Sequence, residues 1–79
     1  MITYISAKDL VRVRSIGSQT AARRIQKVKK EKKLTNTNLV SLADYCEVLG
    51  ENYIELLALI NTNSIVEFVK LYRTLNSAV

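Results

Sequence analysis

The stretch SQTAARRIQKVKKEKK, residues 18–33, decides the fold, because its apolar and basic residues alternate with a helical period. Ala21, Ala22, Ile25 and Val28 recur at intervals of three and four residues, which places them on one narrow stripe of a helix. Nearly every other position is polar or basic. We therefore expect a helix that packs one edge on a core and leaves a wide basic face in solvent.

Helix start signals recur along the chain as Ser or Asn followed three residues later by Asp or Glu, which is the pattern of a capping box. The four pairs are Ser6 with Asp9, Ser41 with Asp44, Asn52 with Glu55, and Ser64 with Glu67. Ser18 is expected to cap the basic helix by itself. With the apolar spacing, these signals predict five helices, over 7–14, 19–33, 42–49, 53–61 and 65–75.

Length and composition favour one compact all-α domain over residues 1–79. The chain is short for a core without disulfides or metals, but 48% of it is hydrophobic and it contains no proline to interrupt helices. We expect a helix-turn-helix in residues 6–33 and a C-terminal helical core in 41–75. The polar stretch 35–38 predicts a loop between the second and third helices, with a small wing-like hairpin as the alternative.

Apolar spacing in the flanking helices predicts which side chains face inward. In the first helix these are Leu10, Val11 and Val13. The last helix carries an apolar stripe made of Ile65, Phe68, Val69 and Tyr72. This stripe favours a homodimer that forms through the last helix.

Charge is divided unevenly along the chain. Residues 8–33 hold ten basic side chains against Asp9 and Glu31, which gives that stretch a charge of +8 within a net charge of +5. The remainder is −3, because Lys70 and Arg73 face five acidic residues there. A field of this kind attracts polyanions to one end of a molecule by steering and counterion release.

Several function classes are excluded or disfavoured by what the sequence lacks. Without histidine and with Cys46 as its single cysteine, the chain cannot form a Cys/His metal site, and Cys46 is expected to be a small buried hydrophobe. It has no glycine-rich phosphate loop either. We expect no enzyme activity and no cofactor. With no leader peptide and no span of about 20 apolar residues, the protein is expected to be soluble and cytoplasmic, without membrane contact.

Two helices joined by a short turn, the second of them basic, form the layout of a helix-turn-helix that binds double-stranded DNA. Gln19, Thr20 and Arg23 would approach base edges, and the lysines, including Lys29 and Lys32, would follow the phosphates. The predicted DNA-binding residues are Ser18, Gln19, Thr20, Arg23, Arg24, Lys27, Lys30 and Lys33.

The segments SAKDL (6–10) and SIGSQTAARRIQKVK (15–29) resemble the small excisionase-like helix-turn-helix proteins of bacteriophages and integrative elements. The resemblance covers residues 6–33 and implies that the second helix enters the major groove, in a regulatory or recombination-accessory role. The implied contacts are Gln19, Thr20, Arg23, Arg24 and Lys27. The pair Arg14-Ser15 stands where the family usually has Leu-Gly.

Three other interpretations of the basic run stay open. A lysine-rich helix face is often only a solvated surface. The same face could belong to a small phage-type inhibitor that binds a host protein complex in place of nucleic acid. It could also bind single-stranded or structured RNA.

Overall fold

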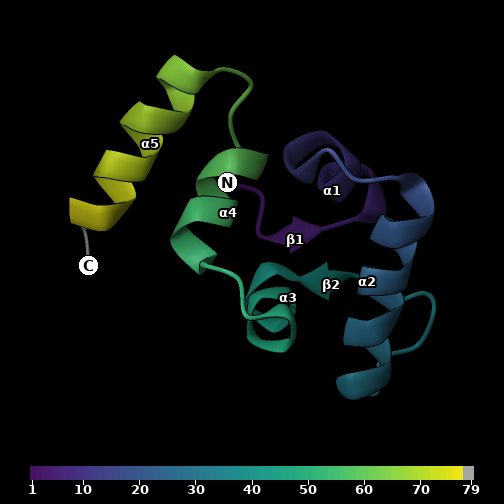
Figure 1. The fold of residues 1–79 in the computed structure, drawn as a ribbon. Helices are drawn as coiled ribbons and strands as arrows, with labels where there is room; N and C mark the ends of the chain where they lie inside the picture. Colours follow the sequence, from purple (N-terminus) through teal and green to yellow (C-terminus); the bar gives the residue numbers. More distant parts are fainter. Residues whose placement is uncertain (78–79) are drawn as a thin grey trace.

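The structure, a computed structural model, describes residues 1–77 and shows five helices with one very short sheet (Figure 1). The elements are β1 (Tyr4–Ile5), α1 (Ala7–Arg14), α2 (Ser18–Glu31), β2 (Val40–Ser41), α3 (Leu42–Leu49), α4 (Tyr53–Ile60) and α5 (Ile65–Ser77). The predicted all-α class is confirmed. The predicted bounds of α1 and α3 agree with the structure, and those of the other helices differ only near their ends.

Local hydrogen bonds begin four of the five helices where the sequence predicts them. Each cap side chain accepts the backbone N–H three residues ahead, over 2.8–3.3 Å. The acceptors are Ser6, Ser41, Asn52 and Ser64. The prediction for α2 was wrong. Gly17 is its N-cap, so no side chain caps the helix, and Ser18 is its first helical residue.

The turn between α1 and α2 is three residues long and depends on Ser15. This residue has φ 53° and ψ 40°, the left-handed conformation that favours glycine. Serine therefore occupies a backbone position that glycine adopts without strain. The short turn brings α1 and α2 into direct contact.

A two-stranded sheet joins the start of the chain to its middle, which the sequence did not predict. Tyr4 lies opposite Ser41 and Ile5 opposite Val40 in an antiparallel pair. The alternative of a wing-like hairpin between α2 and α3 was wrong, and the favoured loop is present. Thr35 and Asn38 close this loop, since the backbone N–H of each residue donates to an oxygen of the other.

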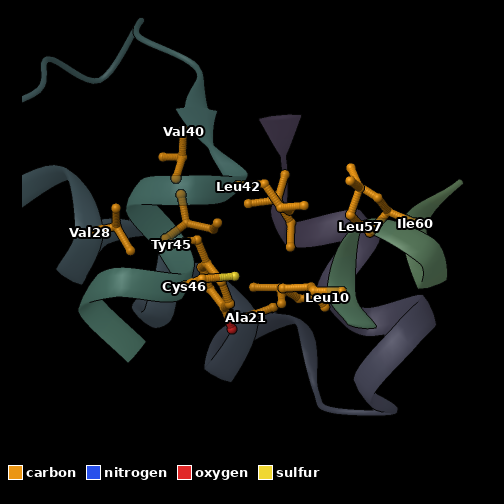
Figure 2. Packing of buried hydrophobic residues seen from close by; sticks show 12 residues of the cluster. Leu10, Ala21, Val28, Val40, Leu42, Tyr45, Cys46, Leu57 and Ile60 are labelled. Atoms are coloured by element: carbon orange, nitrogen blue, oxygen red, sulfur yellow. The ribbon is translucent and has the colours of Figure 1, made fainter. Parts of the chain in front are cut away.

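The core lies where α1, α2, α3 and α4 meet (Figure 2). Its largest fully buried side chains are Tyr45, Leu10, Leu42, Leu56, Val28 and Val40. Two residues predicted to face inward do not. Val11 is 39% exposed and Ala22 is exposed, because each lies about 100° around its helix from a buried neighbour. The buried stripe on each helix is therefore narrower than the sequence suggests.

The last helix, α5, lies outside this core and packs on α4 (Figure 1). None of its 13 residues is buried. The predicted stripe is divided: Phe68 and Tyr72 are half-buried, whereas Ile65 is 82% exposed. Within residues 1–77, no helix has the length and apolar character needed to cross a bilayer.

Candidate nucleic-acid interface

The outward face of α2 is polar and basic along its whole length. Ala21, Ile25 and Val28 are buried against the core, so the opposite side of the helix faces solvent. That opposite side carries Gln19, Thr20, Arg23, Gln26, Lys27 and Lys30, all of them exposed. We call these six residues the α2 face. Gln26 lies on this face although it was not among the predicted DNA contacts.

Seven of the eight predicted DNA-binding residues are exposed in the structure, and Arg24 is the exception. Five of the eight belong to the α2 face: Gln19, Thr20, Arg23, Lys27 and Lys30. Ser18 lies in the first turn of α2, to the side of that face, and Lys33 follows the end of the helix. The structure therefore brings five of the predicted residues onto one surface and places the other three around it.

Arg24 lies at the edge of the α2 face, close to Tyr45 of α3. The Tyr45 hydroxyl is buried and has no hydrogen-bond partner among the described residues. Burial raises the pKa of Tyr45, and Arg24, as a neighbouring hydrogen-bond donor and positive charge, offsets part of that rise. Arg24 therefore also contributes to the electrostatics of the core, which none of the other predicted contacts does.

Lys33 has a backbone conformation that is unusual for a lysine. Its φ is 56°, and the two N–H groups that follow the helix close a Schellman motif: Leu34 donates to the Lys29 carbonyl over 2.8 Å and Lys33 to that of Lys30 over 3.3 Å. Glycine is the usual residue at this position. The motif ends α2 and holds the Lys33 backbone in a defined place beside the α2 face.

Four basic residues of the 8–33 stretch have partners inside the protein. Arg12 donates to the carbonyl oxygens of Ile60 and Thr62, at 3.1 and 3.2 Å, and so satisfies the end of α4. Arg14 is half-buried and pairs with Glu51 at 2.9 Å and Glu55 at 3.4 Å.

Lys29 and Lys32, which were predicted to follow phosphates, are the other two. Lys29 Nζ donates to the Asn36 carbonyl over 2.9 Å. Lys32 Nζ lies 2.7 Å from Glu47 and 4.0 Å from Asp44, and the hydrogen bond that Lys32 donates to Glu47 raises the pKa of Lys32. These two side chains help to hold the 32–39 loop and α3 against α2 and are less available to a ligand.

The remaining cations of this stretch form no ion pair with the described residues. They are Lys8, Arg23, Arg24, Lys27, Lys30 and Lys33. Glu31 is the one acidic residue of α2, in its last turn, and the first turn holds none. The α2 face therefore combines unpaired positive charge with amide and hydroxyl side chains that can donate and accept hydrogen bonds.

No protein-family model, no curated protein and no solved structure matches this chain. Within the described part of the chain, no three cysteine or carboxylate side chains gather in a way that could hold a metal ion. The functional conclusion therefore depends on the charge and geometry of the α2 face.

Proposed function

We propose that this chain is a sequence-specific double-stranded DNA-binding protein that places α2 in the major groove. Its role would be regulatory or recombination-accessory, as in the excisionase-like proteins of phages and mobile elements, and it would act in the cytoplasm. The observation that carries this proposal is the α2 face, where Arg23, Lys27 and Lys30 are exposed and unpaired beside Gln19 and Gln26.

The dimensions and chemistry of α2 suit a major groove. The groove is about 12 Å wide and admits one helix with its side chains. Arginine reads guanine and glutamine reads adenine through paired hydrogen bonds, which suits Arg23 and Gln19 near the start of the helix. Lys27, Lys30 and Lys33 follow at the other end, where they can contact phosphates.

The start of α2 also favours an approaching phosphate. It has no acidic residue in its first turn and no side-chain cap at Gly17, so its first backbone N–H groups are not occupied by a capping side chain. The positive end of the helix dipole lies at the same place. The missing cap, which weakens α2 slightly by itself, is therefore compatible with a helix that completes its hydrogen bonds on DNA.

The test is fluorescence anisotropy of a labelled duplex at several salt concentrations, with the duplex first selected from a randomised pool. We expect a steep salt dependence. In Arg23→Ala/Lys27→Ala, loss of Lys27 should decrease the slope by about one, and loss of Arg23 should weaken the sequence preference. The matched control is Lys32→Ala. This substitution removes a cation at the end of α2 that already pairs with Glu47. This control should keep the wild-type slope.

The other interpretations make different predictions in the same assay. A phage-type inhibitor would bind a folded protein tightly and naked duplex weakly, and an RNA-binding protein would prefer a single-stranded or structured RNA probe. Binding without sequence preference and without sensitivity to Arg23→Ala/Lys27→Ala would overturn the proposal. A homodimer, which many helix-turn-helix proteins form on paired half-sites, is tested by sedimentation equilibrium.

A further inference from the structure

The outward side of α5 combines apolar and basic side chains. Ile65, Val66 and Val69 are exposed, at 82%, 64% and 36%, and belong to the helix half nearest its start. Lys70 and Arg73 come later in the helix, lie on the same side of it, and are also exposed. We call these five residues the α5 face. Exposed apolar residues that gather in this way mark an interaction surface more often than isolated ones do.

A groove of about 380 Å³ lies beside this face, between α1, α4 and α5. Ile65 and Phe68 of α5 form one wall, and Val13 and Leu59 contribute from α1 and α4. Arg12 also lines the groove, but its guanidinium is held by the carbonyl oxygens at the end of α4. The groove is large enough to take one or two apolar side chains of a partner next to the exposed residues.

A second copy of this chain is a poor partner for the α5 face on charge grounds. Lys70 and Arg73 form no ion pair with the described residues, so a well-matched partner would supply carboxylates. Six of the seven acidic side chains of this chain are already hydrogen-bonded or paired: Asp9, Asp44, Glu47, Glu51, Glu55 and Glu67. The seventh, Glu31, lies on α2.

The arrangement of the helices also argues against a dimer that forms through α5. α2 and α5 lie on opposite sides of the molecule, with α3 and α4 between them (Figure 1). The α2 face looks away from the core and hence away from α5. A symmetric dimer through α5 would direct the two α2 faces outward in opposite directions, where they could not reach adjacent half-sites of one duplex.

The chemistry of the α5 face also separates a protein partner from the other polyanions. A duplex would leave Ile65 and Val66 against phosphates. An anionic membrane would be contacted best by aromatic anchors, but Phe68 and Tyr72 are half-buried and contact each other, with their ring centroids 5.5 Å apart. We propose that the α5 face and its groove dock an acidic amphipathic helix of another protein, with apolar residues on the groove and carboxylates at Lys70 and Arg73.

The test uses a pair of labelled helical peptides with the full-length chain. Both peptides carry leucines along one face, and that face is flanked by glutamates in one peptide and by lysines in the other. We expect the glutamate peptide to bind at least about tenfold more tightly in an anisotropy titration. The charge-reversed variant Lys70→Glu/Arg73→Glu should invert this preference, and Ile65→Asp/Val69→Asp should abolish binding of both peptides.

The α2 face is itself basic, so the matched control is Lys27→Glu/Lys30→Glu. This variant should bind the glutamate peptide as the wild type does, while the α5 variants should retain wild-type binding to duplex DNA. The inference is overturned if the α2 variant, rather than the α5 variants, weakens binding of the glutamate peptide. It is also overturned if the glutamate peptide binds no better than the lysine peptide. A dimer in sedimentation that Ile65→Asp dissociates, or binding to phosphatidylserine vesicles that the α5 variants lose, would also overturn it.

Discussion

Tyr45 is an unusual core residue, because its ring fills the centre of the core while its hydroxyl has no partner. The side chain is fully buried, and an unsatisfied buried hydroxyl costs about 1 to 3 kcal/mol. Tyr45→Phe keeps the ring and removes that cost, so we expect it to stabilise the fold by about 1 kcal/mol. Urea denaturation measures the change. A loss of stability would show that the hydroxyl is hydrogen-bonded in solution, with the neighbouring Arg24 as the donor.

The backbone conformation of Lys33 lowers the stability of the fold, whereas its charge is proposed to strengthen DNA binding. A non-glycine residue in the left-handed region costs about 1 kcal/mol relative to glycine. We expect Lys33→Gly to raise the free energy of unfolding by about that amount and to lower the salt slope of DNA binding by about one. Denaturation and salt-dependent anisotropy measure the two effects. The matched control is Lys33→Asn, because asparagine tolerates this conformation and the substitution also removes the charge.

At the scale of helices and strands, the sequence predicts what local interactions determine. The caps at Ser6, Ser41, Asn52 and Ser64 involve residues three positions apart, and their hydrogen bonds are all present. The β1–β2 pair could not be predicted in the same way. Its strands have two residues each and are separated by α1 and α2, so neither carries a readable alternation.

The candidate site was likewise predictable where it depends on local helical spacing, and not where it depends on contacts between distant parts of the chain. Helical spacing placed Arg23, Lys27 and Lys30 on one side of α2, because that depends only on the period of the helix. The sequence could not reveal that Lys29 and Lys32 have partners, since Asn36 and Glu47 come near them only after the chain turns back. Which cations remain unpaired is a property of the tertiary structure.

Arg12 connects α1 to the end of α4, where no local residue satisfies both carbonyl groups. Its guanidinium donates to the Ile60 and Thr62 carbonyl oxygens, and its charge suits the negative end of the α4 dipole. We expect Arg12→Ala to cost about 1 kcal/mol of stability. Lys8→Ala, on the same helix without such a partner, should change stability little. Thermal denaturation of both variants provides the comparison, and equal losses would contradict this role for Arg12.

For the molecule as a whole, burial of two ionisable core residues predicts a loss of stability at alkaline pH. Burial raises the pKa of Cys46 and of Tyr45 above the values of 9.0 and 10.0 expected in an unfolded chain. The folded state therefore keeps protons that the unfolded state releases, so stability is full below about pH 9 and falls as pH rises further. Denaturation from about pH 8 to about pH 10 measures the slope. Cys46→Ala/Tyr45→Phe should show a smaller pH dependence, whatever its absolute stability.

The two ends of the molecule also differ in how firmly they are held. α2 contributes Ala21, Ile25 and Val28 to the core, whereas α5 contributes no buried residue and rests on α4. Segments with little buried apolar surface open at a lower free energy than the global unfolding reaction. We therefore expect the backbone amides of α5 to exchange with deuterium faster than those of α2 and α3. Hydrogen exchange followed by NMR measures this, and the Tyr45 amide serves as the core reference.

Equal protection in all three helices would contradict the expectation. If that protection decreased on dilution, a second copy of the chain would be covering α5. If the acidic peptide slowed exchange in α5 alone, that helix would be the element it orders.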